Sequence, residues 1–328
     1  MALVEAMGAL ARKPDRARPV QAASDGEHAE LVAAFNAMLA EVQARERLLA
    51  ARIAAETPPD FSGRAPPRLS ADDHALLRDL EHALDEDALS LLYQPQIDRD
   101  GATLTGVEAL LRWTHPVRGP ISPDLFIPLA ERTGLIRRIT AWVLDRAMRE
   151  TAVLAPLPIA FNASAAEFGD PEFGGRLGEL IEGHDYDPSR LEIEITETAI
   201  LRHEDEVLRN MTRLQRLGVR IALDDFGAGY SSLRHLRLFP FDKLKIDKAF
   251  ITSCGNDSES AAVVHAVVSI GRALGMKVVA EGVETEVQQR FLRVAGVHAM
   301  QGWLFGQPRP IADLIERVAA PPSVAAAG

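Results

Sequence analysis

Cysteine is almost missing from this chain, which has Cys254 and no other among its 328 residues. A single thiol cannot form a disulfide within the chain, and it cannot supply the set of thiolates that holds a structural zinc ion. This usage is typical of proteins from a reducing compartment, so we expect a cytoplasmic location.

Long apolar runs are missing too. No stretch of about 18 uncharged apolar residues occurs, so the sequence predicts no membrane span. The most apolar region, AAVVHAVVSIGRALGMKVVA, is interrupted by His265, Arg272 and Lys277. The first residues, MALVEAMGALARK, lack a basic region before their apolar part, which is atypical of a signal peptide. We expect inner-membrane association only if a segment upstream of this start is missing.

Positive charge is in deficit, because the chain has a formal net charge of -11. Residues 1–70 carry nine basic and nine acidic side chains, so the acidic excess belongs to the rest of the chain. An acidic domain does not attract long nucleic acid through its general field. A phosphate-bearing ligand would therefore need metal ions that neutralise the site locally.

Several catalytic signatures are absent from the sequence. No Gly-rich phosphate loop follows a predicted strand, which argues against a dinucleotide-binding fold. The letters DFG at 225–227 occur without the Gly-rich loop, VAIK strand and HRD loop of a kinase. Ser164 has no nucleophile elbow around it, so a hydrolase triad is not expected.

The N-terminal part differs from the rest of the chain. Residues 55–69 hold four prolines and indicate a semi-stiff linker. Residues 26–54 predict an amphipathic helix whose apolar seam suits a partner helix, although packing on its own domain is the alternative. The seam consists of Leu31, Phe35, Met38, Val42 and Leu49. At the other end, residues 319–328 are predicted to form a disordered tail.

Strand and helix patterns alternate between residues 70 and 318. LSLLYQPQID and TLTGVEALLRW flank the turn DRDG at 98–101, which predicts a β-hairpin. Helix–strand units follow, the first opened by Ser122 and Pro123. Counting the hairpin as two gives eight strands in about 230 residues, the size of one (β/α)8 barrel. The predicted fold is therefore α/β, a TIM-like barrel with one antiparallel strand, preceded by an α-helical N-terminal arm.

Polar side chains recur where the predicted strands end. In a closed parallel barrel these ends converge on one face, where such barrels carry their chemistry. Carboxylate and amide oxygens suit hard divalent cations. Singly, each of these residues is more often a cap or a loop residue, but their shared position favours a metal site. They are Glu108, Asn162, Glu194, Asp224, Asp225, Lys245, Glu281 and Gln301.

The adjacent pair Asp224 and Asp225 is the sharpest local signal. Neighbouring strand residues point to opposite faces, so the backbone must turn at the strand end for both carboxylates to face one site. Glu194 lies inside an apolar strand, where an unpartnered carboxylate is costly, and Glu192 shares its face at a deeper level. Glu197, at the strand's mouth, could brace a neighbouring loop.

Lys245 follows a short apolar strand, KLKID. Beside cations and carboxylates it could orient or deprotonate a water molecule. The alternative is a plain salt bridge with Asp242 or Asp247, which lie within three residues of it. The sequence leaves both readings open.

Eight segments in order resemble the EAL domain, a cyclic di-GMP phosphodiesterase, from about residue 71 to 318. Each segment alone is weak, but all eight in this order are highly specific. Residues 26–46 also resemble the second helix of a HAMP linker domain, so 1–54 is expected to be a HAMP-like segment. The eight segments are YQPQ (93–96), EALLRW (108–113), FNAS (161–164), EITET (194–198), DDFGAGYSSL (224–233), KID (245–247), AEGVET (280–285) and QGWLFGQP (301–308).

The EAL resemblance implies a TIM-like barrel that hydrolyses cyclic di-GMP to linear 5'-pGpG by two-metal-assisted attack of water, in bacterial second-messenger signalling. It implies two Mg²⁺ or Mn²⁺ ions. Their ligands would be Glu108, Asn162, Glu194, Asp224, Asp225 and Glu281. Catalytic roles would fall to Lys245, Glu281 and Glu197, and substrate binding or support to Gln94, Arg112, Gln301 and Glu284.

Other readings of the same residues stay open. A catalytically silent cyclic di-GMP receptor or signalling scaffold is the main alternative, although such receptors usually lack a ligand that this chain keeps. Action on another phosphodiester is a further one. We expect a homodimer through the barrel and the N-terminal helix. Ala228 stands where many members have threonine, which removes one possible loop hydrogen bond.

Overall fold

The computed structural model describes residues 69–196, 200, 204–226, 233–254 and 257–319. The HAMP-like segment, most of the proline-rich linker and nearly all of the expected tail lie outside these residues, as does Glu197. Among the residues described, no helix combines the length and the apolar character that crossing a membrane requires.

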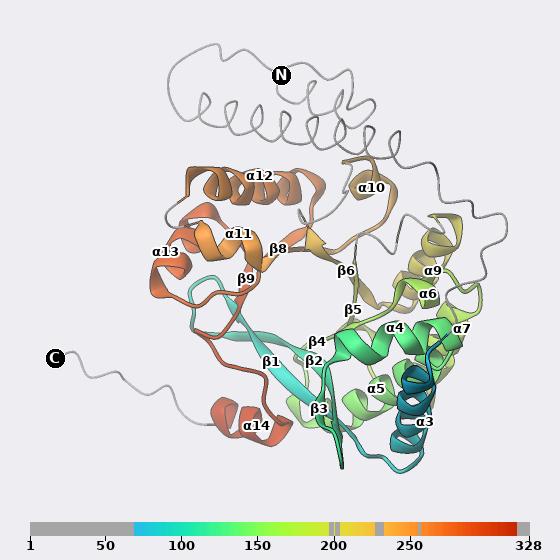
Figure 1. Cartoon of the computed structure of the whole chain (residues 1–328). Coiled ribbons are helices and arrows are strands. Elements are labelled where there is room, and N and C mark those ends of the chain that lie inside the picture. Colours follow the sequence, from blue (N-terminus) through green and yellow to red (C-terminus); the bar gives the residue numbers. More distant parts are fainter. Residues whose placement is uncertain (1–68, 197–199, 201–203, 227–232, 255–256, 320–328) are drawn as a thin grey trace, which may run out of the picture.

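Eight strands close into a barrel with helices around it (Figure 1). The strand order is β1-β9-β8-β7-β6-β5-β4-β2, and a pairing between β1 and β2 closes the ring, while β3 adds a further strand at the edge of β2. This confirms the predicted TIM-like barrel. The strands are β1 Leu89–Asp98, β2 Leu104–His115, β3 Gly119–Ile121, β4 Ile159–Asn162, β5 Leu191–Thr196, β6 Arg220–Phe226, β7 Lys243–Ile246, β8 Lys277–Ala280 and β9 Ala299–Gln301.

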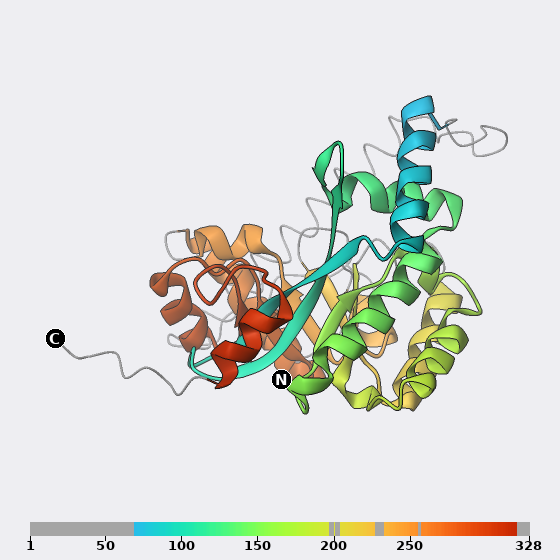
Figure 2. The same ribbon diagram turned by 90° about the horizontal axis from the view of Figure 1, so that it is seen from below.

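The predicted hairpin is the antiparallel element of the barrel. β1 runs antiparallel to both β2 and β9, whereas the other barrel pairs are parallel. Leu89, the first residue of β1, lies opposite Trp113 near the end of β2. β1 therefore begins at the end of the barrel where the parallel strands finish (Figure 2).

The helices follow the strands in sequence and pack outside them. Ser122 caps α4 with Pro123 at its first position, as predicted, and Ser70 caps α3 in a reciprocal capping box with Asp73. The α-helices are α3 Ala71–Asp85, α4 Pro123–Thr133, α5 Ile136–Thr151, α6 Ala165–Phe168, α7 Phe173–Gly183, α9 Glu204–Leu217, α10 Leu233–Leu238, α11 Lys248–Ser253, α12 Ser258–Leu274, α13 Glu286–Ala295 and α14 Ile311–Ala319, with short 3-10 turns η2 Ala152–Leu154 and η3 Pro188–Arg190.

The hydrophobic core lies between the strands and the helices rather than inside the barrel. Ile193, Leu223 and Leu244 are fully buried core residues on three successive strands. Because strand residues alternate between faces, their sequence neighbours point into the barrel, and those neighbours are polar or small. The barrel interior is thus free to carry charged groups, with Glu194 and Lys245 as its most buried examples.

Candidate active site

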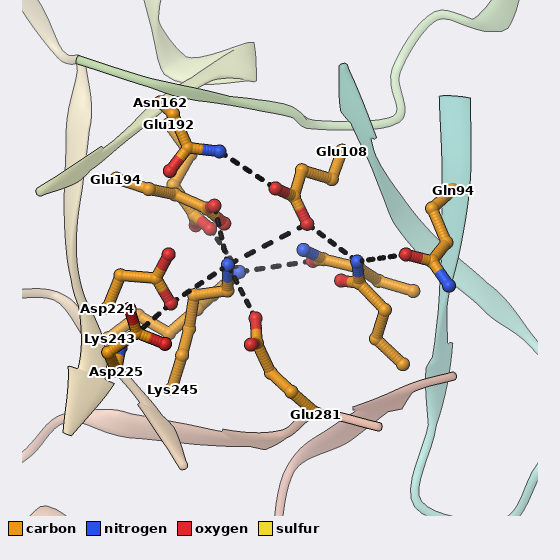
Figure 3. Close-up of polar contacts among 12 residues, drawn as sticks. Gln94, Glu108, Asn162, Glu192, Glu194, Asp224, Asp225, Lys243, Lys245 and Glu281 are labelled. Atoms are coloured by element: carbon orange, nitrogen blue, oxygen red, sulfur yellow. Dashed lines mark hydrogen bonds and ion pairs between the residues drawn. The ribbon is translucent and has the colours of Figure 1, made fainter. Parts of the chain in front are cut away.

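Lys245 occupies the centre of the mouth of the barrel, and its side chain is 1% exposed (Figure 3). Its strand, β7, carries the ammonium group inward from a position where Leu244 and Ile246 anchor the backbone in the core. Four carboxylates from four other segments surround this nitrogen. Lys245 Nζ lies 2.5 Å from Glu194 Oε2, 2.6 Å from Glu281 Oε1, 3.2 Å from Asp224 Oδ1 and 3.7 Å from Glu108 Oε2.

The expected local salt bridges of Lys245 are not formed. Asp242 instead accepts hydrogen bonds from the backbone of Ile221 and the side chain of Gln215. Asp247 caps α11 by accepting from the backbone nitrogen of Ala249. The reading of Lys245 as an ordinary bridge to its sequence neighbours was therefore wrong, because strand alternation turns it into the barrel.

The end of β6 brings Asp224 and Asp225 to the same place. Asp225 has a left-handed backbone with φ of 53°, and the pairing of β6 with β7 shifts register between Leu223 and Phe226. This turn lets both carboxylates face one site, as the sequence required. One oxygen each from Asp224, Asp225 and Glu281 lie within 4.8 Å of one another.

Amide side chains complete the ring on the β1–β2 side. Asn162 Nδ2 donates to Glu108 Oε1 at 2.9 Å, and Gln301 Nε2 donates to Glu108 Oε2 at 2.6 Å. Gln301 Nε2 also donates to Gln94 Oε1 at 3.0 Å. Gln94 in turn donates to the carbonyl oxygen of Gly306, so β1, β2, β4 and β9 are tied together at this level.

Three of the acids hold their protons unusually tightly. Burial, with the repulsion of Glu108 and other neighbouring carboxylates, raises the pKa of Glu194 well above its ordinary value. Burial and the nearby Asp224 likewise raise the pKa of Glu281 to about 8, although Lys245 acts in the opposite direction. The pKa of Asp225 is raised to about 6 by burial and by Asp224.

The other two buried groups stay charged. Burial alone would raise the pKa of Glu108, but Lys245 and the amide donors outweigh it, and this pKa is lowered. Burial opposes the charged form of Lys245, yet the surrounding carboxylates raise its pKa well above the ordinary value. One ammonium group therefore does not suffice to keep all of these carboxyl groups ionised.

The donor set suits divalent cations. When ionised, Glu108, Glu194, Asp224, Asp225 and Glu281 carry five negative charges against the one positive charge of Lys245. Two divalent ions would balance the difference. Two buried oxygens at this level, Oε1 of Glu194 and Oε1 of Gln301, have no hydrogen-bond partner in the protein, as expected of atoms that face an ion or its water.

Among the residues described, the side chains of two expected site residues, Arg112 and Glu284, make no hydrogen bond or ion pair with the ring. Arg112, four residues beyond Glu108 on the same strand, is half-buried and donates to the carbonyl oxygen of Leu111, and burial lowers its pKa. Glu284 is exposed, and its backbone nitrogen donates to Gln288 Oε1 at the start of α13. No side-chain contact joins Glu284 to the ring among the residues described.

Comparison with known proteins decides the family. The EAL domain model matches residues 77–308. The chain belongs to the EAL family. The matched region of this EAL domain contains the ring of carboxylate and amide side chains described above, so the family assignment and the geometry agree. The proposed boundary at 70–318 extends slightly beyond the match and stays a prediction.

Curated relatives of the EAL domain are longer proteins. It is 45% identical over 249 residues to the bifunctional diguanylate cyclase/cyclic di-GMP phosphodiesterase MucR of Pseudomonas aeruginosa, covering 74% of this chain and 36% of the relative. It is 38% identical over 243 residues to the cyclic di-GMP phosphodiesterase NbdA of the same organism, covering 73% and 31%. The chain thus spans about a third of the length of these relatives.

Solved structures share the barrel. The EAL domain superposes on the structure of the PaMucR phosphodiesterase in complex with c-di-GMP with a TM-score of 0.70 and 44% identity, covering 73% of this chain and 99% of that chain. An EAL domain protein from Listeria monocytogenes gives a TM-score of 0.66 at 29% identity, covering 74% and 96%. The fold around the ring is therefore that of EAL domains.

Proposed function

We propose that this EAL domain hydrolyses cyclic di-GMP, opening one phosphodiester bond to give linear 5'-pGpG with the help of two Mg²⁺ or Mn²⁺ ions. The observation that carries the proposal is the ring of five carboxylates at the mouth of the barrel, four of which surround Lys245. The names of two relatives, MucR and NbdA, support the same substrate.

The ring divides into two sets of candidate ligands. Asp224 lies between them, because it contacts Lys245 on one side and shares a cluster with Asp225 and Glu281 on the other. Divalent ions held there would polarise the phosphate and lower the pKa of water towards neutral. The proposed ligands are Glu108, Asn162, Glu194 and Asp224 for one ion, with Asp224 and Asp225 for the other and Glu281 completing the cluster.

Lys245 acts as a fixed positive charge in this proposal. The surrounding carboxylates raise the pKa of Lys245, so it keeps its proton. We therefore assign it the role of orienting the attacking water and the carboxylates rather than that of accepting a proton. Gln301 holds Glu108 through a 2.6 Å hydrogen bond, and its unpartnered Oε1 can accept a hydrogen bond from water in the same layer. Arg112 is proposed to contact a phosphate, and Gln94 to support the substrate from β1.

One incubation tests the proposal. The purified chain is mixed with cyclic di-GMP in Mg²⁺, Mn²⁺, Ca²⁺ or EDTA, and the products are identified by chromatography and mass spectrometry. We expect pGpG in Mg²⁺ and Mn²⁺, no product in EDTA, and slow turnover in Ca²⁺, which is larger and accepts looser coordination. Equal rates in Ca²⁺ and Mg²⁺ would count against the geometry.

The same experiment separates the alternatives. Tight binding of cyclic di-GMP with no pGpG in Mn²⁺ would show a receptor instead of an enzyme. Faster cleavage of another cyclic nucleotide in a competition assay would show a different phosphodiester substrate. The homodimer, the role of the N-terminal helix in control and the cytoplasmic location stay predictions, to be checked by mass measurement on the full chain and on residues 70–328, and by fractionation.

A further inference from the structure

A second ring of side chains lies directly beneath the catalytic ring. Residues two apart on a strand share a face and are separated by about 6.6 Å along it. Moving two residues deeper from each member of the catalytic ring therefore defines a lower layer on the same eight strands. This lower layer consists of Gln96, Gly106, Ala160, Glu192, Ala222, Lys243, Val279 and Ala299.

The composition of the lower layer is unusual for a barrel of this kind. Bulky branched residues normally fill the interior of a TIM barrel. Here Val279 is the one branched apolar residue of the layer, Ala160, Ala222 and Ala299 are small and buried, and Gly106 has no side chain at all. These small residues leave room in the interior for the three long polar side chains of the layer.

Lys243 contacts both of the other polar residues of the lower layer (Figure 3). Lys243 Nζ lies 2.5 Å from Glu192 Oε1 and 3.4 Å from Gln96 Oε1. Glu192 is 1% exposed, Gln96 is 3% exposed and the Lys243 side chain is 12% exposed, so the ion pair of Glu192 and Lys243 is largely withdrawn from bulk solvent. Replacing a buried ion pair with packed apolar groups is often neutral or stabilising, so stability alone does not account for it.

The lower pair repeats the geometry of the upper pair. Lys243 and Lys245 come from β7, and Glu192 and Glu194 come from β5, with β6 between these strands. Each ion pair therefore crosses the interior and joins two strands that are not neighbours. If Glu194 binds a metal ion, it must share its carboxylate between that ion and Lys245. The ion pair of Glu192 and Lys243 has no such second role.

Two buried polar atoms of the lower layer have no partner in the protein. They are the donor Nε2 of Gln96 and the acceptor Oε2 of Glu192. Neither residue is a candidate metal ligand, so an ion at the mouth does not explain them. Buried water typically makes about three hydrogen bonds to such groups, and small neighbours provide the space for it.

We propose that Gln96, Glu192 and Lys243 hold ordered water beneath the catalytic ring and position Glu194 and Lys245 for metal binding. The inference rests on the proposed metal site. In this proposal, the ion pair of Glu192 and Lys243 fixes the separation of β5 and β7. The water forms hydrogen bonds with the two unpartnered atoms, Gln96 Nε2 and Glu192 Oε2. These residues are positioning residues, because they do not touch the proposed ions or the substrate.

The water is tested on the unchanged protein. A crystal structure of the full chain, at a resolution that shows ordered water, should place a water molecule within about 3.2 Å of both Gln96 Nε2 and Glu192 Oε2. A dry interior at this level would overturn the hydration half of the proposal. This measurement needs neither substrate nor turnover, so it is independent of the proposed function.

The positioning role is tested with the double variant Glu192→Leu/Lys243→Met. Calorimetric titration with Mn²⁺, in the absence of substrate, should show affinity reduced roughly tenfold or more, as for residues that support metal ligands. The melting temperature should stay close to that of the parent or rise. Lys243→Arg, which keeps the charge, should recover part of the affinity. Lys277→Met is the matched control, since Lys277 is exposed on the neighbouring strand.

Unchanged Mn²⁺ affinity in a folded double variant would show that the lower layer does not position the metal site, and it would overturn the proposal. If that variant does not fold, Gln96→Leu serves instead, because it removes the water's donor without removing a charge. Gln96→Leu with parental Mn²⁺ affinity would overturn the proposal, and a reduced affinity would support it. If the parent binds Mn²⁺ but does not cleave cyclic di-GMP, the proposed function fails while this comparison still stands.

Discussion

Lys245 Nζ and Glu281 Oε1 are 2.6 Å apart, and the same nitrogen lies 2.5 Å from Glu194. One ammonium group thus serves several carboxylates at once, and the raised pKa values of Glu194 and Glu281 show that it does not offset their burial together with the repulsion from neighbouring carboxylates. Without divalent ions, ionising all of these acids is unfavourable. The stability of the protein should therefore depend on pH and on metal in a linked way.

The first prediction concerns the metal-free protein between pH 5 and pH 8. Glu281 and Asp225 have raised pKa values, about 8 and about 6, so the folded state binds more protons than the unfolded state in this range. The contribution of these two groups to stability is complete only below their ordinary pKa values of 3.8 and 4.5, and it is lost as the pH rises from 5 towards 8. Thermal unfolding in EDTA should show a lower melting temperature at pH 8 than at pH 6. Each kcal/mol of lost stability should lower the melting temperature by roughly 2–4 °C.

Metal should reverse this dependence, because ligands must lose their protons to bind it. Adding Mn²⁺ should raise the melting temperature more at pH 8 than at pH 6. A metal-free melting temperature that increases steadily from pH 6 to pH 8 would contradict the charge excess.

The second prediction concerns Asp224, which lies between the two groups of ligands. Asp224→Ala should lower turnover of cyclic di-GMP at least about 100-fold, the upper end of what supporting residues cost. The metal-free variant should be no less stable at pH 8 than the parent, because one repelling charge is gone. Asp205→Ala, on the exposed start of α9, is the control. Turnover at the parental rate in Asp224→Ala would end the two-metal proposal.

The third prediction concerns Asp225, whose φ of 53° is left-handed. Asn tolerates this backbone, whereas Ala pays about 1–2 kcal/mol for it. Both Asp225→Asn and Asp225→Ala should weaken Mn²⁺ binding, but Asp225→Ala should also unfold at lower denaturant concentration. Equal stability of the two variants would show that the strained turn is relaxed in solution.

The fourth prediction concerns Lys245. Lys245→Met should cut turnover about 100-fold, the order of loss expected when reacting groups are no longer held in position. In EDTA its loss of stability should be larger at pH 8 than at pH 6, since the carboxylates around it are then less protonated. Lys277→Met should show neither effect. A Lys245→Met protein as active as the parent would leave the central residue of the ring without a role.

The fifth prediction concerns the turn after Gln301. A Cβ at Gly302 would lie 2.2 Å from the backbone nitrogen and oxygen of Val283, so Gly302→Ala must displace one strand end. We expect a destabilisation of about 1–3 kcal/mol, together with reduced turnover as Gln301 shifts. Gly183→Ala is the matched control, because nothing lies within 4 Å of a Cβ there. Denaturant unfolding and initial rates measure both effects.

The barrel and the membership of its ring were predictable from the sequence. Alternation within β5 and β7 puts Glu194 and Lys245 on the inner face, and the ends of parallel strands meet at one rim. The hairpin followed from the turn at 98–101. The need for a backbone turn at Asp225 was also visible, since adjacent residues on a regular strand cannot share a face.

The partners of Lys245 and the role of Lys243 were not predictable in the same way. Local sequence offered Asp242 and Asp247, but each satisfies backbone donors near its own strand or helix. The contacts of Lys243 with Glu192 and Gln96 depend on how far the barrel closes and on the space left by small residues. A signal does exist for Lys243, because it lies two residues before Lys245 and so shares its face.

The direction of β1 has a consequence for how the candidate site could be controlled. In a barrel whose strands all ran parallel, the chain would enter its first strand at the end remote from the chemistry. Here α3 leads into β1 at Leu89, beside Trp113, at the rim that bears the carboxylates. A mechanical or binding input delivered to α3 thus arrives at the end of the barrel that carries the candidate metal ligands and need not travel the length of the cylinder.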